Sequence, residues 1–216
     1  MAPADVLVVM ARQPTPGAVK TRLARRIGAT AACAVYRAFL ADIAATLGAG
    51  PWQLTWAVTP AEADLRPIVG EAADCIAQRG ADLGARMANG FADLFARGAR
   101  RVAMIGADVP HLGAAAVAAA FAALDECDVV LTPTRDGGYC LVGQHAAHDL
   151  FSGIDMGTER VFAQTRARLE ALGLRASIQP QTFDVDEWED VLALRALMDQ
   201  GIVSLPKLAA VIAALS

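Results

Sequence analysis

Short, almost wholly apolar runs alternate with longer amphipathic segments along most of the chain. Residues 6–10 and 102–105 are such runs, which are typical of strands buried on both faces of a sheet. Between them, residues 82–97 place Leu83, Met87 and Phe91 at the spacing of one helix face. This alternation predicts an α/β fold with a mostly parallel central sheet and helices on both of its faces.

The same pattern gives approximate positions for the individual elements. We expect strands at residues 5–10, 52–58, 75–79, 101–106, 128–132, 139–142 and 175–179. We expect helices at residues 23–47 with a break near Gly28, in a short segment opening at Pro60, and at 82–97, 114–124, 158–172 (with Thr158 as N-cap) and 187–200.

The length of 216 residues suits a single domain over residues 1–216, and no internal repeat or linker interrupts it. With 55% hydrophobic but only 6% aromatic residues, the core must be built mainly from Ala, Leu and Val. The four cysteines form no C-x-x-C pair, so neither a zinc site nor a disulfide framework is indicated.

Two features of the sequence bear on where the protein resides. Asp5 stands where a signal peptide would need basic residues, and the Ala-rich stretch at 113–124 is too short to span a bilayer. We therefore expect a soluble, cytoplasmic protein with no membrane partner.

Charge is distributed unevenly along the chain. Six basic and no acidic residues lie between residues 6 and 41, whereas the whole chain has 19 basic and 23 acidic residues. A net charge of −4 argues against a nucleic-acid partner, because binding a phosphate backbone needs a broad basic surface. A local basic cluster in an acidic protein suits a small phosphorylated ligand better.

The basic cluster follows the first predicted strand. Lys20 and Arg22 lie at the end of a loop that contains Pro16 and Gly17, and Arg12 lies just before that loop. Proline and glycine fix and open the backbone there, and backbone N–H groups with cationic side chains hold phosphate well. We predict that these five residues bind nucleotide phosphates; solvated surface charges are the alternative.

Three aspartates occupy comparable positions later in the chain. Asp108 follows the strand expected at 101–106, and Asp184 and Asp186 precede the last long helix. The carboxyl ends of parallel strands share one edge of a sheet, and carboxylate oxygens are the ligands that Mg²⁺ and Mn²⁺ prefer. We predict that the three bind Mg²⁺ (or Mn²⁺) beside the phosphates. The alternative is that Asp108 is a cap or turn residue and that Asp184 or Asp186 caps the helix.

Two further segments offer contacts to a substrate. Asp136, Gly137 and Gly138 follow another predicted strand, and their glycines would let a sugar or an acceptor lie close to the backbone. A simple hairpin turn is the alternative. Arg86, in the first turn of the helix at 82–97, could reach a substrate phosphate or simply cover that helix.

Four segments in chain order resemble the motifs of one family. They are P-x-P-G-x-x-K-T-R-L (14–23), Q-x-x-x-D-L-G-x-R-M (78–87), I-G-A-D-x-P-x-L (105–112) and T-P-T-R-D-G-G-Y (132–139). They resemble the DUF2064 family, whose customary label is a glycosyltransferase associated with radical-SAM or arsenosugar gene clusters. The family is grouped with the GT-A-fold nucleotide-diphospho-sugar transferases and is similar to 2-phospholactate guanylyltransferase and the molybdenum cofactor guanylyltransferase.

The resemblance implies roles for particular residues. Asp108 would take the place of the metal-binding Asp, Lys20 and Arg22 that of the phosphate loop, and Asp184-Val-Asp186 that of a late D-V-D that supplies another metal carboxylate. The chain departs from the superfamily in two places. Its first loop lacks a G-x-G-T-R run, and Gly106 stands where a D-x-D pair would have its first Asp.

These observations favour a metal-dependent transferase that uses a nucleotide donor, with Lys20, Arg22 and Asp108 as catalytic residues. Transfer of a nucleotidyl group from a nucleoside triphosphate to a small phosphorylated acceptor is slightly favoured, and glycosyl transfer from a nucleotide sugar is the alternative. A catalytically silent nucleotide-binding protein is a further alternative. A Rossmann dehydrogenase is excluded, because no G-x-G-x-x-G follows the first strand. The apolar segment at 205–215 could pack on the protein's own core or support a homodimer.

Overall fold

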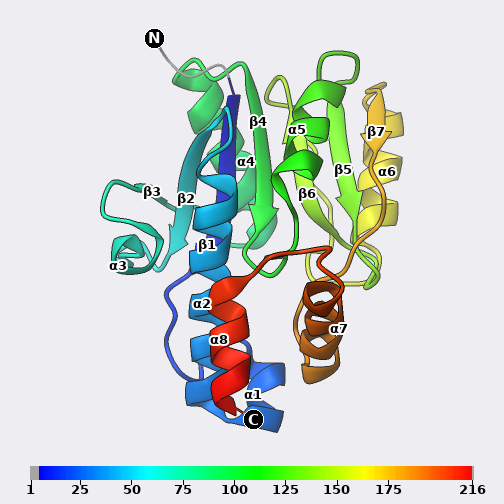
Figure 1. The fold of residues 1–216 in the computed structure, drawn as a ribbon. Helices are drawn as coiled ribbons and strands as arrows, with labels where there is room; N and C mark the ends of the chain where they lie inside the picture. The colour runs from blue at the N-terminus through cyan, green and yellow to red at the C-terminus, as the bar shows by residue number, and fades with distance from the viewer. Residues whose placement is uncertain (1–4, 216) are drawn as a thin grey trace.

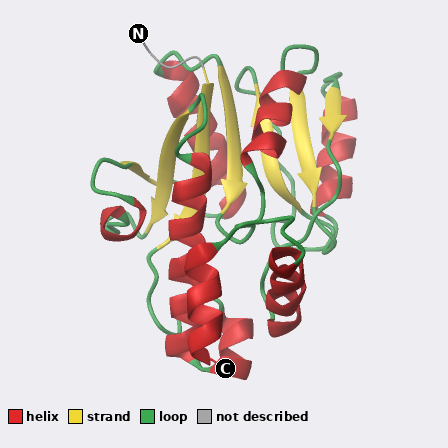
Figure 2. Ribbon diagram, viewed as in Figure 1, coloured by secondary structure: helices red, strands yellow, loops and turns green. Residues whose placement is uncertain are grey.

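A seven-stranded sheet forms the centre of the protein (Figures 1 and 2). The structure is a computed structural model and describes residues 5–215. The strand order of the sheet is β3-β2-β1-β4-β6-β5-β7, and β6 runs antiparallel to its neighbours β4 and β5 whereas the other pairs are parallel. The strands are β1 (Asp5–Arg12), β2 (Gln53–Thr59), β3 (Asp74–Ala77), β4 (Arg101–Gly106), β5 (Val129–Pro133), β6 (Tyr139–Gln144) and β7 (Ala176–Ile178).

Helices cover both faces of this sheet, as the sequence predicts. They are α1 (Thr21–Ile27), α2 (Ala29–Leu47), α3 (Arg66–Val69), α4 (Leu83–Ala96), α5 (Ala114–Ala123), α6 (Val161–Ala171), α7 (Trp188–Asp199) and α8 (Pro206–Leu215). In Figure 1, α4 and α6 lie behind the sheet and α2 and α5 in front of it. Strand β1 shows why two cores form: Val6 and Val8 point to the side of α4, and Leu7 and Val9 point to the side of α2.

The register of the parallel strands brings several loops to one edge of the sheet. Arg12 at the end of β1 lies opposite Thr59 at the end of β2, and Met10 lies opposite Gly106 at the end of β4. The loops that follow β1, β2 and β4 therefore open at the same edge, at the bottom of Figure 1, where α1 and α7 also lie.

The break expected near Gly28 is confirmed, and it separates two helices. Gly28 has a φ of 84°, a left-handed conformation that glycine adopts without steric cost, and it lies between the end of α1 and the start of α2. Helix α2 is long and apolar enough to cross a membrane by length and composition alone. In this fold its side chains Phe39, Leu40 and Ile43 are buried in the core, as expected of the central helix of a globular domain.

Two local predictions are wrong. Pro60 does not open a helix: the backbone N–H of Ala63 bonds to its carbonyl in a turn, and α3 begins only at Arg66. Thr158 is not the N-cap of α6, which is Arg160. The Thr158 hydroxyl belongs to the preceding turn, where it donates to the carbonyl of Asp155 (2.9 Å) and accepts from the backbone N–H of Arg160 (3.3 Å). The helix starts at Val161, so its first apolar residue marks the boundary better than the threonine does.

The apolar C-terminal segment packs on the protein's own core. Helix α8 lies along α2, and Leu208 and Ile212 are buried. The buried carboxylate of Asp42 in α2 accepts hydrogen bonds from the backbone N–H groups of Lys207 (3.0 Å) and Leu208 (2.9 Å) at the start of α8. Asp42 therefore acts as a cap supplied by a neighbouring helix.

Replacing Asp42 with alanine is expected to lower the free energy of unfolding by about 1–3 kcal/mol, because two backbone donors lose their acceptor. Urea unfolding followed by circular dichroism measures the change. Asp42→Asn keeps one acceptor oxygen and should cost less than alanine does. An alanine variant as stable as the wild type would show that this carboxylate does not hold α8 in place.

Candidate functional site

Lys20 points from the basic loop into the protein rather than into solvent. It lies at the N-cap of α1 with a φ of 48°, the left-handed conformation, and its side chain is 3% exposed. Its ammonium lies 5.6 Å from the centre of the Phe39 ring. A lysine so enclosed is not a solvated surface charge, so that alternative is wrong for Lys20.

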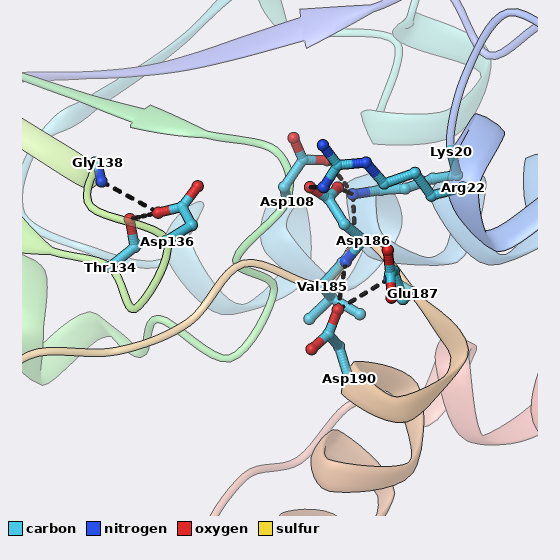
Figure 3. Close-up of polar contacts among 10 residues, drawn as sticks. All are labelled: Lys20, Arg22, Asp108, Thr134, Asp136, Gly138, Val185, Asp186, Glu187 and Asp190. Atoms are coloured by element: carbon cyan, nitrogen blue, oxygen red, sulfur yellow. Dashed lines mark hydrogen bonds and ion pairs between the residues drawn. The ribbon is translucent and has the colours of Figure 1, made fainter. Parts of the chain in front are cut away.

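The Lys20 ammonium joins the carboxylates of two distant segments (Figure 3). It forms an ion pair with Asp108, donates to Asp186 Oδ1 (3.1 Å), and donates to the backbone carbonyl of Val185 (2.6 Å). These three acceptors match the three N–H donors of the ammonium. The side chains of Asp108 and Asp186 remain 46% and 43% exposed, so both still have oxygen surface open to a ligand.

The two segments that carry these carboxylates are also joined through the backbone. The N–H of Val185 donates to the carbonyl of Asp108 (2.9 Å), which holds the segment before α7 against the loop after β4. Neither carboxylate caps a helix. The N-cap of α5 is Gly113, and the N-cap of α7 is Glu187, which forms a capping box with Asp190. The capping alternatives are therefore wrong for Asp108, Asp184 and Asp186.

A cavity of about 680 Å³ opens beside this ion-paired cluster. Its lining includes four cationic side chains and three carboxylates, and we call it the basic half of the cleft. The cations are Arg12, Lys20, Arg22 and Arg86, and the carboxylates are Asp82, Asp108 and Asp186. The side chain of Arg22 is 63% exposed and its guanidinium lies 3.8 Å from the Asp186 carboxylate, so it is free to turn towards a bound anion.

A second cavity of about 480 Å³ continues from the first. The two cavities share six lining residues, which mark the junction of one continuous cleft: Met10, Arg22, Leu83, Gly106, Asp108 and Asp186. The carboxylates along the second cavity outnumber the cations, and we call it the acidic half. They are Asp108, Asp136, Glu159, Asp184 and Asp186.

The predicted site residues do not all reach the cleft. Pro16 and Gly17 are exposed and line neither half. Gly17 has a φ of 82°, so its role is to turn the loop that presents Lys20. Gly137 also lines neither half: a Cβ there would lie 2.1 Å from the carbonyl oxygen of Glu159, so this glycine serves close packing between two loops.

Asp136 has a structural role in addition to facing the cleft. Its carboxylate accepts hydrogen bonds from the hydroxyl of Thr134 (2.6 Å) and from the backbone N–H of Gly138 (3.1 Å), and these bonds close the turn between β5 and β6 (Figure 3). The hairpin-turn alternative is therefore correct for its local structure. Asp136 and Gly138 still line the acidic half.

The three predicted metal ligands differ in their surroundings. Burial, together with the nearby carboxylates of Asp136, Asp108 and Asp186, raises the pKa of Asp184 to about 7. Mg²⁺ is usually held by one or two protein carboxylates together with phosphate oxygens and water. The half-exposed pair Asp108 and Asp186 fits that ligand set. Asp184, partly protonated near neutral pH, fits it less well.

Two residues of the basic half were not predicted from the sequence. The side-chain amide of Gln78 donates to the carbonyls of Ala11 (3.2 Å) and Ala57 (2.8 Å), and so holds the ends of β1 and β2 together. The hydroxyl of Tyr36 accepts a hydrogen bond from the backbone N–H of Arg12 (3.0 Å). Gln78 follows a strand and is detectable by that position, whereas Tyr36 has the spacing of an ordinary core residue in a helix.

A group of metal-type ligands also lies away from the cleft. Ligand atoms of Asp128, His145 and His148 come within 4.8 Å of one another, the one such trio within residues 5–215. It lies where β5 begins and β6 ends, opposite the edge that carries the cleft. Asp128 there accepts from His145 (3.1 Å) and from the backbone N–H of Arg175 (2.7 Å), contacts that anchor the start of β5.

Comparisons with known proteins bear on this architecture. The family described as "Uncharacterized protein conserved in bacteria (DUF2064)" matches residues 41–158. This range contains three of the four motifs quoted above, including the one with Asp108. A search of curated proteins found none that matches the chain.

Several solved structures share the fold. One is described as a "putative nucleotide-diphospho-sugar transferase" from Desulfovibrio desulfuricans G20, with 29% identity and a TM-score of 0.90 over 98% of this chain and 96% of that one. A CMP:2-keto-3-deoxy-manno-octonic acid synthetase in complex with CTP has 14% identity and a TM-score of 0.56 over 91% and 99% of the two chains. A cytidylyltransferase from Leptospira borgpetersenii has 12% identity and a TM-score of 0.59 over 98% and 93%. The predicted GT-A fold is thereby confirmed.

Proposed function

The chain belongs to the DUF2064 family and is a transferase with the fold of nucleotide-diphospho-sugar transferases, and from this premise we propose that it transfers a nucleotidyl group from a nucleoside triphosphate to a small acceptor. One observation carries the proposal: Lys20 of the first loop meets Asp108 and Asp186 where the basic and acidic halves of the cleft join. The basic half would hold the nucleotide, and the acidic half would hold the acceptor.

The chemistry of the basic half suits a triphosphate. Arg12, Lys20, Arg22 and Arg86 can each donate to phosphate oxygens, and Lys20 is held in place by Val185 and Phe39. Cations fixed before the reaction begins stabilise the charge that develops on the leaving pyrophosphate without reorganising. Arg22, exposed and weakly paired, is suited to follow that group as it departs.

A divalent cation completes this arrangement in the proposal. Asp108 and Asp186 would hold Mg²⁺ or Mn²⁺, which when bound neutralises phosphate charge and orients the phosphate groups. Lys20 would keep the two carboxylates together and supply a further positive charge. Asp184, deeper in the acidic half, would face the acceptor rather than the metal.

Glycosyl transfer from a nucleotide sugar is the second candidate. It is favoured by the description of the 29%-identical structure as a nucleotide-diphospho-sugar transferase. The two reactions break different bonds. Nucleotidyl transfer releases pyrophosphate, whereas glycosyl transfer releases a nucleoside diphosphate.

The slow reaction of bound donors with water distinguishes the two candidates. The protein would be incubated with Mg²⁺ and either the four nucleoside triphosphates or UDP- and GDP-sugars, and the products identified by ³¹P NMR. Nucleoside monophosphate with pyrophosphate is the expected result, and nucleoside diphosphate with free sugar would support the second candidate. A protein that binds nucleotide equally well without Mg²⁺ and cleaves no donor would instead be a silent binding protein.

A further inference from the structure

The two halves of the cleft differ in the sign of their charge. The basic half has four cationic side chains against three carboxylates. In the acidic half, Arg22 is the one cationic side chain among the lining residues that the structure describes, and it faces five carboxylates. A ligand bound there meets a negative potential, even after Asp108 and Asp186 are neutralised by Lys20 or by a metal.

Three further carboxylates line the acidic half but not the basic half. Asp136 closes the turn after β5, Asp184 precedes α7, and Glu159 lies exposed just before α6. None of the ion pairs found among residues 5–215 involves these three side chains. A phosphate or carboxylate group on a ligand would therefore meet repulsion from these side chains, with Arg22 at the junction as the one lining cation to offset it.

Apolar side chains form part of the surface between these carboxylates. Met156 and the buried core side chains of Met87 and Met104 line the acidic half, and half-exposed Leu83 lies at its junction with the basic half. Methionine side chains are flexible and polarizable, so they adjust to apolar groups of different shapes. The lining thus offers an apolar surface for the body of a ligand and carboxylates for its hydroxyl or ammonium groups.

We infer that the acceptor is an uncharged or cationic alcohol or amine with an apolar part, and that it carries no phosphate. This inference rests on the proposed function and departs from the phosphorylated acceptor that the sequence favours. In the reaction, an acceptor oxygen or nitrogen forms a new bond to the α-phosphorus of the nucleoside triphosphate. The bond from that phosphorus to pyrophosphate breaks, pyrophosphate leaves over Lys20 and Arg22, and the acceptor proton passes to water.

Matched pairs of compounds test this class directly. Each pair consists of a compound and its phosphate ester: benzyl alcohol with benzyl phosphate, ethanolamine with phosphoethanolamine, and glucose with glucose 6-phosphate. Binding to the full chain, saturated with nucleotide and Mg²⁺, would be measured by saturation-transfer NMR. The unphosphorylated member of at least one pair is expected to bind at least tenfold more tightly than its phosphate ester. Tighter binding of the esters, or binding of neither kind, would overturn the inference.

Reversing the charge of Glu159, an exposed residue that lines the acidic half, tests the same inference with a variant protein. Glu159→Lys is expected to raise the affinity for the phosphate esters at least fivefold, because it replaces one of the five carboxylates of the acidic half with a second cation beside Arg22. Glu170→Lys makes the same change at an exposed residue near the end of α6 that lines neither half of the cleft, and it should leave the affinity unchanged. Equal effects of both variants would show that bulk charge, and not the lining of the acidic half, decides selectivity.

Measuring nucleotide binding distinguishes a failure of this inference from a failure of the proposed function. If calorimetry shows nucleotide binding with Mg²⁺ but phosphate esters are preferred, the acceptor class is wrong and the proposed function stands. If no nucleotide binds, the proposed function fails, whichever acceptors are selected.

Discussion

Replacing Lys20 with methionine is expected to weaken nucleotide binding by about 1.5–3 kcal/mol, or roughly tenfold to 150-fold in Kd. Methionine preserves most of the buried stem but removes the ammonium that joins Asp108 and Asp186. The two carboxylates would then face each other without a cation, and the phosphates would lose a fixed donor. Isothermal titration calorimetry with a nucleoside triphosphate and Mg²⁺ measures the change.

Arg25→Met is the matched control for that variant. Arg25 lies on α1 as well, but its side chain is exposed and lines neither half of the cleft. Its replacement should change Kd by less than twofold. A Lys20→Met protein that is folded, as judged by circular dichroism, and binds nucleotide like the wild type would remove Lys20 from the site.

Asp108→Asn is expected to lower the rate of donor turnover by about 10²–10³-fold, the size measured when one fixed electrostatic contact to a reacting group is lost. Asparagine keeps the shape of the side chain but removes the charge that Asp108 offers to both Lys20 and a divalent cation. Because this side chain is nearly half exposed, the substitution should leave the fold intact. Initial rates of product release at saturating donor, measured over a range of Mg²⁺ concentrations, give the effect.

Asp199→Asn on α7 removes the same charge from an exposed position outside the cleft, and its rate should match that of the wild type. An Asp108→Asn rate within a few fold of the wild type, with the same Mg²⁺ dependence, would contradict a role for this carboxylate in the reaction.

The fold followed closely from the sequence because its strands are short, apolar and separated by clear turns. The expected strand at residues 101–106 has the observed bounds, and β1 differs only by extending to Arg12. The errors fall where a polar residue or a proline is common both in a turn and at the start of a helix. Pro60 and Thr158 both belong to turns that precede a helix, and only the surrounding structure distinguishes such a turn from the helix start.

The sequence predicted which charged residues form the site, but not how the cleft divides into a basic and an acidic half. Residues that follow strands, such as Lys20 and Asp108, meet because parallel strands end at one edge of the sheet. Their position along the chain does not say which side of that edge each carboxylate faces. The grouping of Asp136 and Glu159 in one cavity depends on the packing of α6 against the turn at Gly137.

The central claim is that nucleotide phosphates bind between Lys20 and a metal held by Asp108 and Asp186. A crystal structure of the protein with a nucleoside triphosphate and Mn²⁺, with the manganese located by its anomalous scattering, tests it most directly. The account predicts manganese bound to both carboxylates and a phosphate oxygen within hydrogen-bond distance of Lys20 Nζ. Nucleotide bound outside the cleft, or phosphates that touch neither Lys20 nor the metal, would contradict it.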